Sequence, residues 1–343
     1  MTRHFLTTLD WSVEEVRDLV DRALRIKRGT DRPSLAGRIL GLMFFNPSVR
    51  TRVSCESAIA RLGGAAIAVS PGSETWSFEH EDGAVMDGAT QEHVRELAPV
   101  LSRYCHAIGI RKSELITTAA TTARVTASWP ELRRDAFLRK FAERATVPVI
   151  NLESNAFHPC QGLADMATMV EKLGDPRGKK YVLTWAWHPK SLPVATPHSQ
   201  LLAACDLGMD VTLLRPPRYE LDPEVTAAAK RRAEEAGGSL RETDDVETAY
   251  RGARIVTAKS WGSLAYYGRF DQEARDKQGL RAGWIVDEAK LAKTADAWFM
   301  HCLPVRRNVV VTDGVLDGPR SIVVDEAENR LWTAAAVLCA LLG

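Results

Sequence analysis

Residues 39–52, ILGLMFFNPSVRTR, place an apolar run directly before an amphipathic segment that continues to Leu62. This order predicts a strand, a turn and a helix. At such a junction the N–H groups of the first helical turn carry partial positive charge, and Ser48-Val49-Arg50-Thr51-Arg52 adds two guanidinium and two hydroxyl groups. Because arginine grips phosphate oxygens as a bidentate fork, the segment predicts a site for a small phosphorylated anion. The alternative is a serine that only caps the helix, beside two solvated arginines.

The same alternation of apolar and amphipathic runs extends outward in both directions. Strand-like runs cover residues 39–45, 65–70, 107–111, 147–152, 181–186, 210–214, 254–258 and 297–300, and helix-like runs include 91–104, 162–173, 223–236 and 326–342. This is the pattern of βαβ units, so we predict an α/β fold with two doubly wound parallel sheets. A break near residues 147–153 divides the chain into two halves. Ligands of open α/β sheets bind at the carboxyl ends of the strands, which places the expected active site between the halves.

One segment does not fit this pattern. Residues 188–199 hold three prolines directly after an apolar strand. Because proline fixes φ and disfavours helix, we predict a long ordered loop here.

Composition narrows the class of protein. A chain of 343 residues suits two domains, and 45% hydrophobic with 26% charged residues is typical of globular proteins. The net charge of +1 argues against a nucleic-acid surface, and no apolar run is long enough to span a membrane. The N-terminus lacks the pattern of a secretory signal, and the six cysteines show no CxxC spacing. We therefore expect a cytoplasmic protein with no metal and no cofactor.

Polar residues with suitable chemistry also follow two further predicted strands, 107–111 and 147–152. His158-Pro159-Cys160-Gln161 lies between the strand that ends at 152 and the helix that begins near 162. Its imidazole and amide can both hydrogen-bond a planar carbonyl or amide group. Arg111 ends the strand 107–111. The alternatives are a histidine satisfied at a helix start and an ordinary exposed arginine.

The second half contributes two more clusters. His301-Cys302-Leu303-Pro304-Val305-Arg306-Arg307-Asn308 follows the strand 297–300. Adjacent residues of an extended chain point to opposite faces, so His301 is poorly placed to activate Cys302, and we expect a binding cysteine rather than a nucleophile. Glu326-Ala327-Glu328-Asn329-Arg330 opens the last helix. There the acids complement the helix dipole, and Arg330 can reach inward.

Together, Ser-x-Arg-Thr-Arg, His-Pro-x-Gln and His-Cys-Leu-Pro, in this order, resemble the motifs of the aspartate/ornithine carbamoyltransferase family. The resemblance covers nearly the whole chain, from Phe45 to Arg330. It implies a carbamoyl-phosphate-binding domain of residues 1–150, on which a C-terminal helix, 326–343, packs back, and an amino-substrate-binding domain of residues 151–325.

The resemblance also implies roles for particular residues. The phosphate group would be held by Ser48, the N–H of Val49, Arg50 and Thr51, and the carbamoyl group by Arg111, His158, Gln161 and Arg330. The reaction implied is attack by a neutral amine on the carbamoyl carbon, with phosphate leaving and able to take up the proton. Catalysis would come from positioning and from four donors, Arg50, Arg111, His158 and Arg330.

The amine is indicated by one departure from the ornithine enzymes. They carry an Asp-x-x-x-Ser-Met-Gly motif whose aspartate pairs with the α-ammonium, whereas this chain reads Val256-Thr-Ala-Lys259-Ser-Trp261-Gly262. A lysine would repel an α-ammonium but suit an N-acylated ornithine with a free carboxylate. The chain most resembles the subgroup that uses N-acetylornithine or N-succinylornithine, which is trimeric and has a knotted proline-rich loop. By that likeness Glu153, Lys259, Cys302, Leu303 and Arg306 would contact the acylated substrate, and Trp76 would enter the carbamoyl phosphate site of a neighbouring subunit.

Two positions bear on the acyl group. Acetyl-specific members carry a glutamate and succinyl-specific members a proline where this chain has Gln91, which we expect to contact the acyl substrate. Acetyl-type enzymes also carry a lysine that becomes carboxylated where this chain has Val310. The valine at position 310 favours N-succinylornithine as the substrate, whereas Gln91, which is polar like glutamate, favours N-acetylornithine.

We predict an N-acetylornithine carbamoyltransferase of arginine biosynthesis, acting as a homotrimer on two small-molecule substrates, with no nucleic-acid or membrane partner. The alternatives are an N-succinylornithine enzyme, a carbamoyltransferase for another amine, and an anion-binding regulatory protein. An anion-binding regulatory protein would retain the phosphate site without catalysis. Such a protein needs no residues that polarise a carbonyl group, so the presence of these residues argues against it.

Overall fold

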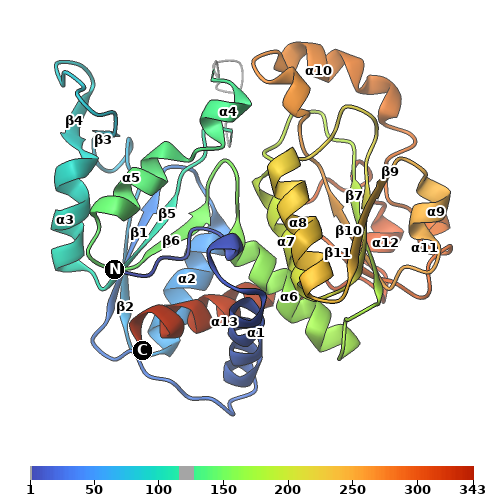
Figure 1. The fold of residues 1–343 in the computed structure, drawn as a ribbon, viewed down its shortest axis with the longest axis horizontal. Coiled ribbons are helices and arrows are strands. Elements are labelled where there is room, and N and C mark those ends of the chain that lie inside the picture. The colour runs from blue at the N-terminus through green and yellow to red at the C-terminus, as the bar shows by residue number, and fades with distance from the viewer. Residues whose placement is uncertain (1, 116–126) are drawn as a thin grey trace.

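The computed structural model describes residues 2–115 and 127–343, and two parallel sheets organise it (Figure 1). The first sheet has the strand order β2-β1-β5-β6, with every pairing parallel. Its strands are β1 (Ile39–Phe44), β2 (Ala65–Val69), β5 (Ala107–Arg111) and β6 (Val149–Glu153). Because β1, β5 and β6 are buried almost throughout, their sequences read as continuous apolar runs rather than as alternating ones.

The second sheet has the order β11-β10-β7-β8-β9 and is also parallel throughout. It consists of β7 (Lys180–Trp185), β8 (Asp210–Leu214), β9 (Ser239–Thr243), β10 (Ile255–Lys259) and β11 (Trp298–Met300). In each sheet the chain winds outward from a central strand in one direction and then returns to wind in the other. The reversal lies between β1 and β5 in the first sheet and between β7 and β10 in the second. The predicted doubly wound α/β fold is confirmed.

Helices cover both sheets (Figure 1). Those before β7 are α1 (Val13–Lys27), α2 (Val49–Arg61), α3 (Val94–Tyr104), α4 (Trp129–Leu132), α5 (Ala136–Arg144) and α6 (Pro159–Leu173). Those after β7 are α7 (Ala195–Asp206), α8 (Pro223–Glu235), α9 (Val246–Tyr250), α10 (Phe270–Asp276), α11 (Glu288–Leu291), α12 (Asp313–Leu316) and α13 (Val323–Leu342). Short 3-10 turns lie at Thr8–Asp10, Leu264–Tyr266 and Gln278–Leu280, and β3 (Ser77–Glu79) pairs with β4 (Thr90–His93).

The last helix joins the two ends of the chain. Figure 1 shows α13, in red, beside the blue and green helices, and it contacts α1, α2 and α6. Every residue from Thr333 to Cys339 is buried, so this part of α13 is covered on all sides. The domain boundary at residue 150 stays a prediction. Strand β6, which belongs to the first sheet, runs across that position.

Two predicted elements differ from the structure. The predicted loop 188–199 is wrong at its end, because α7 begins at Ala195; Pro197 lies in its first turn, where a helix needs no N–H donor. The predicted helix 91–104 begins only at Val94, because Thr90–His93 pairs with β3. Strand β9 was not predicted, because three of its five residues are charged or small and it lies at a sheet edge. In the part of the chain that the structure describes, no helix has the length and apolarity to cross a membrane.

Candidate functional site

Several of the predicted site residues follow the carboxyl ends of the strands next to both reversals. Strand β1 leads into the turn that ends at Ser48, and its neighbour β5 ends with Arg111. Strand β10 ends with Lys259, and its neighbour β7 leads into the segment with His188. In doubly wound sheets these are the positions at which loops diverge and leave a crevice for a ligand.

Helix α2 begins at this edge, and its two arginines, Arg50 and Arg52, have different surroundings. Ser48 caps the helix, because its Oγ accepts a hydrogen bond of 3.3 Å from the N–H of Thr51. Arg52 forms an ion pair of 3.1 Å with Glu56 one turn along the same helix. Arg50 is half-buried, and burial together with the nearby charges of Arg330 and Arg111 lowers its pKa. Ser48 therefore caps the helix, which leaves its hydroxyl proton free for the predicted phosphate contact, and Arg52 is paired on the surface, whereas Arg50 faces other cations.

The imidazole of His158 shows where those cations converge. His158 is buried at the start of α6, and its Nδ1 has no hydrogen-bond partner in the described structure. Burial and then the charges of Arg330, Arg111, Lys259 and Arg50 hold its pKa well below the ordinary value. Those four side chains come from α13, β5, β10 and α2. The ring is therefore neutral at neutral pH, at a point of strong positive potential that suits an anion.

A buried ion pair lies beside this ring. Arg111 contacts the carboxylate of Glu153, at the end of β6, and His158 Nε2 lies 3.7 Å from the same carboxylate. All three side chains are buried. The pair holds the Arg111 guanidinium in place, since a buried charge without a partner would be strongly unfavourable.

A second network crosses from α6 to α13. Arg330 Nη1 donates 2.7 Å to Gln161 Oε1, and its Nη2 donates 2.9 Å to Thr51 Oγ1. Gln161 Nε2 donates to Asp165 Oδ1 at 2.7 Å and to Glu326 Oε1 at 3.1 Å. All five side chains are buried. The resemblance described above implies that the Thr51 hydroxyl contacts the phosphate group. In the structure this hydroxyl also accepts a hydrogen bond from Arg330.

The loop after β11 contains no nucleophile and base in working arrangement. His301 Nδ1 accepts a hydrogen bond of 2.9 Å from the N–H of Leu303, so that ring nitrogen serves its own loop. Burial raises the pKa of the Cys302 thiol, which keeps it protonated. Arg306 Nε donates 2.9 Å to His188 Nε2. His188, in the proline-rich segment, thereby joins the site, although no role was predicted for its side chain.

Two predicted residues lie apart from the rest of the site. Trp76 directly precedes β3 and Gln91 lies in β4, and this small parallel β3–β4 unit lies, in Figure 1, on the side of the first sheet away from the second sheet. Trp76 is 52% exposed, and its Nε1 donates 2.8 Å to Glu92. Gln91 is exposed as well. One chain alone does not bring them to His158.

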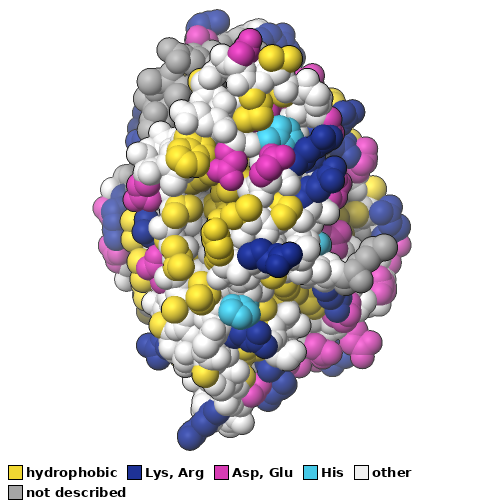
Figure 2. Space-filling model, turned by 90° about the vertical axis from the view of Figure 1, so that its left-hand side faces the viewer, with side chains coloured by type: hydrophobic (Ala, Val, Ile, Leu, Met, Phe, Trp, Pro, Cys, Tyr) yellow, Lys and Arg dark blue, Asp and Glu magenta, His cyan; other side chains and the backbone are white. Residues whose placement is uncertain are grey.

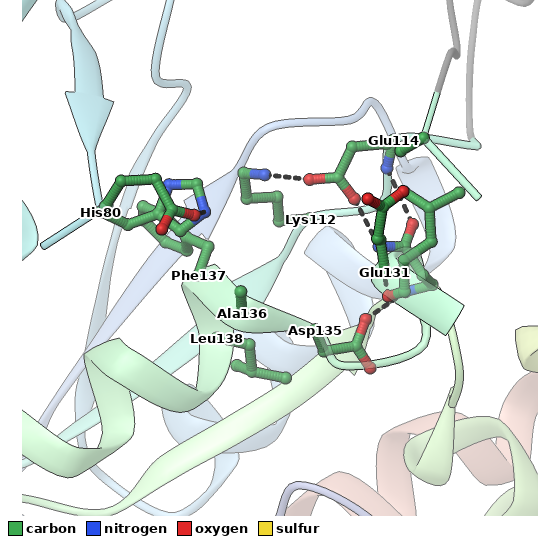
Figure 3. Close-up of a pocket in the computed structure, with 12 residues that line it drawn as sticks. His80, Lys112, Glu114, Glu131, Asp135, Ala136, Phe137 and Leu138 are labelled. Carbon is green, nitrogen blue, oxygen red and sulfur yellow. Dashed lines mark hydrogen bonds and ion pairs between the residues drawn. The ribbon is translucent and has the colours of Figure 1, made fainter. Parts of the chain in front are cut away.

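A separate cavity of about 250 Å³ lies in the first half of the chain (Figure 3). None of the predicted site residues lines it. Figure 3 shows Lys112 paired with Glu114, while Glu131 and Asp135 add further carboxyl groups. Among the described residues, this lining offers no unpaired positive charge of the kind that a phosphate group needs.

Sequence reasoning missed the two acids of the Gln161 network. Asp165 follows Gln161 by four residues in α6, and Glu326 precedes Arg330 by four residues in α13, so each pair shares a helix face. That spacing was the available signal. Glu326 was expected to cap a helix start, but α13 begins three residues earlier, which places Glu326 inside the helix and in the core.

Comparison with known proteins adds the family. Residues 3–171 match the model of the aspartate/ornithine carbamoyltransferase carbamoyl-P binding domain, and residues 193–341 match that of the Asp/Orn binding domain. The N-acetylornithine carbamoyltransferase of Xanthomonas campestris is 44% identical over 99% of this chain and 98% of its own length. The N-succinylornithine carbamoyltransferase of Bacteroides fragilis is 35% identical over 89% of this chain and 87% of its own. An acetylornithine transcarbamylase solved with acetylcitrulline, 44% identical, superimposes with a TM-score of 0.93 over 99% of both chains.

Proposed function

Because this chain belongs to the aspartate/ornithine carbamoyltransferase family, we propose that it transfers the carbamoyl group of carbamoyl phosphate to the δ-amine of N-acetyl-L-ornithine. The products are N-acetyl-L-citrulline and phosphate. The observation that carries this proposal is the convergence of Arg50, Arg111, Lys259 and Arg330 on the neutral ring of His158. Similarity over nearly the full length to an N-acetylornithine enzyme supports the choice of amine.

The chemistry follows from charge and position. The N-terminus of α2 and the Arg50 guanidinium would hold the phosphate group, and they stabilise the charge that grows on it as the carbon–oxygen bond breaks. Arg111, His158 and Arg330 would hold the carbamoyl oxygen, where negative charge develops when the amine attacks. The attacking amine must be neutral, and the departing phosphate takes up its proton. Positioning and electrostatics suffice for this transfer.

Lys259 would select the amine. It lies at the end of β10, close enough to His158, His301 and Cys302 for its charge to affect the pKa of each. A second cation there disfavours the α-ammonium of free ornithine and favours the carboxylate of an acylated one. Glu153, Cys302, Leu303 and Arg306 would complete the contacts with the acylated substrate.

N-Succinylornithine is the second candidate. Val310 packs in an apolar cluster with 2% exposure, so this position offers no lysine for carboxylation. Gln91 is exposed on β4 and is polar like the glutamate of acetyl-specific members. Gln91→Glu should strengthen the preference for the acetyl substrate and Gln91→Pro should shift it to the succinyl substrate.

The test is citrulline-product formation from carbamoyl phosphate with ornithine, N-acetylornithine and N-succinylornithine offered separately at equal concentration. Turnover of N-acetylornithine alone is the expected result, and turnover of N-succinylornithine alone would replace it by the second candidate. Turnover of ornithine would refute the role given to Lys259. If none of the three amines supports phosphate release, the substrate would be another amine. If carbamoyl phosphate binds but phosphate is not released under any condition, the protein would be an anion-binding regulatory protein.

The site is completed, in this proposal, by a second subunit of a homotrimer. Trp76 is half-exposed, and Val85 and Met86 of the same region are 80% and 39% exposed. Figure 2 shows that hydrophobic side chains gather on the left-hand face of the molecule in Figure 1, which carries the β3–β4 unit. An exposed apolar face of this kind is typical of a subunit interface. Trp76 and Gln91 would cross it to reach a neighbouring site.

We also place the enzyme in the cytoplasm and in arginine biosynthesis. All six cysteines are free thiols, which suits a reducing compartment. The segment between β7 and α7 would form the knot of this subgroup. In support, the Leu192 carbonyl accepts 2.8 Å from the N–H of Gly262, and the Ser191 hydroxyl contacts Glu273, which tie the segment to the chain beyond β10.

A further inference from the structure

Helix α10 carries a buried carboxylate to which the proposed reaction assigns no role. Glu273 and Lys277, which lie one helical turn apart, are 0% and 2% exposed. Figure 1 shows α10, in orange, at one end of the second sheet. Lys277 Nζ lies 3.8 Å from Glu273 Oε1, so the two buried charges balance each other. A buried ion pair adds little net stability, so the pair points to a role other than stabilising the core.

The Glu273 carboxylate joins two chain segments that leave neighbouring strands. The Ser191 hydroxyl donates to Glu273 Oε2, and the N–H of Ser263 donates 3.1 Å to Oε1. Ser191 follows β7 and Ser263 follows β10, and these two strands pair with each other. One carboxylate oxygen thus serves each segment. The same charge raises the pKa of Tyr219, which keeps this phenol protonated.

Between these two hydrogen bonds the segments are in backbone contact. The N–H of Gly262 donates 2.8 Å to the Leu192 carbonyl group. A Cβ atom on Gly262 would lie only 3.0 Å from Ser191 Cβ and 3.4 Å from Glu273 Oε2, so any other residue would push the segments apart. We call this contact the Glu273 joint, which consists of Ser191, Leu192, Gly262, Ser263 and Glu273.

Each segment also leads to a cation that would bind the acylated substrate. Lys259 ends β10, directly before the joint. On the other segment, His188 Nε2 accepts 2.9 Å from Arg306 Nε. Because arginine only donates, His188 Nδ1 carries the ring proton, and it lies 3.1 Å from the Lys190 carbonyl oxygen that accepts it. The backbone beside the joint therefore holds the ring to which Arg306 is bound.

We propose that Glu273 is a positioning residue, which holds both segments on one carboxylate and so fixes the spacing of Lys259 and Arg306 for the acylated amine. The inference rests on the proposed function for the identity of that amine. The proposed phosphate and carbamoyl contacts lie on α2, β5, α6 and α13, none of which contributes to the joint. The joint should therefore act on one substrate only.

Two double variants of nearly equal shape isolate the hydrogen bonds from the charge. In Glu273→Gln/Lys277→Met, the amide oxygen still accepts from the N–H of Ser263, and the amide NH₂ donates to the Ser191 hydroxyl. In Glu273→Met/Lys277→Met, the thioether joins neither segment. Replacing Lys277 in both proteins removes a cation that would otherwise stay unpaired in the core. The two proteins thus differ only at the joint.

The experiment is steady-state kinetics of the full-length proteins, with each substrate varied in turn. The variant with glutamine at 273 should keep KM for N-acetylornithine within about threefold of the wild-type value. The variant with methionine there should raise this KM by about tenfold or more, because two hydrogen bonds are lost. KM for carbamoyl phosphate should stay within about threefold in both proteins, and kcat should change less than KM for the amine.

A single variant tests the same joint from its other side. Ser191→Ala removes one hydrogen bond to Glu273 and no charge, and it should raise KM for N-acetylornithine by about threefold or more. Ser239→Ala is the matched control, because the Ser239 hydroxyl donates 3.1 Å to Asp210 at the opposite end of the second sheet. It should leave both KM values unchanged. Ser191→Ala decides the question even where a double variant does not fold.

Hydrogen exchange measures the joint without any substrate. In Glu273→Met/Lys277→Met, the amides of residues 188–194 and 260–264 should both exchange at least about tenfold faster than in the wild type, whereas the glutamine variant should protect both segments. Equal KM values for the amine in the two double variants, or equal exchange, would overturn the positioning role. A wild-type protein that does not turn over N-acetylornithine would refute the proposed function, and the exchange rates would still decide whether Glu273 holds the two segments.

Discussion

Arg50 and Arg52 lie two residues apart on α2 and should respond very differently to replacement. Arg50 faces the cations around His158, whereas Arg52 is paired with Glu56 on the surface. Arg50→Ala removes one donor to the leaving phosphate and should lower kcat by about 10²- to 10³-fold with no loss of thermal stability. Arg52→Ala, the control on the same helix, should stay within about twofold, since a surface ion pair contributes little. Similar kcat values for the two variants would remove Arg50 from the chemistry.

Lys259 should act on one substrate only. Lys259→Ala removes the cation proposed to bind the substrate carboxylate and should raise KM for N-acetylornithine by about tenfold or more, while KM for carbamoyl phosphate stays within about threefold. Lys180→Ala is the control, because Lys180 opens the adjacent strand β7 at its opposite end, where its Nζ donates to the Thr248 and Arg251 carbonyl groups. Steady-state kinetics with each substrate varied in turn measures both. An unchanged KM for the amine in Lys259→Ala would mean that this lysine only covers the surface.

At the scale of residues, the sequence identified side chains whose type and spacing are unusual and missed those that act through a neighbour. The clusters at Ser48, His158 and His301 are recognisable because strands end beside them. Asp165 and Glu326 are ordinary helix residues until Gln161 is seen to donate to both. That meeting depends on the packing of α6 on α13, which no local pattern encodes.

A buried histidine joins α7 to the segment between β6 and α6. The His198 ring is fully buried; one nitrogen lies 2.9 Å from the Ala156 carbonyl oxygen, and the other accepts 3.1 Å from the N–H of Asp222. These two bonds require the neutral ring, and burial lowers the pKa of His198 to about 4. Because the unfolded chain binds the proton near pH 6.5, stability is present above that pH and is lost as the pH falls towards 4.

His198→Gln should therefore flatten the acid side of the stability profile. A glutamine amide can still donate to the Ala156 carbonyl and accept from Asp222, but it does not titrate. When the pH falls from 6.5 to 4, the unfolding free energy should decrease in both proteins. The decrease should be up to about 3 kcal/mol smaller in the variant than in the wild type. Urea unfolding at several pH values measures the difference. Parallel profiles for the two proteins would show that the ring does not resist protonation.

At the scale of elements, the apolar strands were predictable and the polar ones were not. Buried strands such as β5 and β8 match their predicted ranges, because only strands buried on both faces read as short continuous apolar runs. Strand β9 and the β3–β4 unit carry charged residues and lie at edges, so their pairing is set by neighbours rather than by their own sequence.

At the scale of the whole molecule, two doubly wound sheets follow from the order of elements, but the completeness of the site does not. Trp76 and Gln91 belong to a unit at the outer edge of the chain, whereas Arg50 belongs to the site itself. If a neighbour supplies Trp76, each site in a ring of three subunits contains Arg50 from one chain and Trp76 from the next. Such a head-to-tail contact closes into a ring by rotation.

This arrangement predicts complementation between two inactive proteins. Arg50→Ala spoils the site of its own chain, and Trp76→Ala spoils the site of its neighbour. When the two variants are mixed, dissociated and reassembled, every interface in which an intact Trp76 meets an intact Arg50 regains a full site, and random assembly should restore about a quarter of wild-type activity. Each variant treated alone in the same way is the control and should stay inactive. If Trp76 served its own chain, no subunit in the mixture would carry both intact residues, and activity would not return.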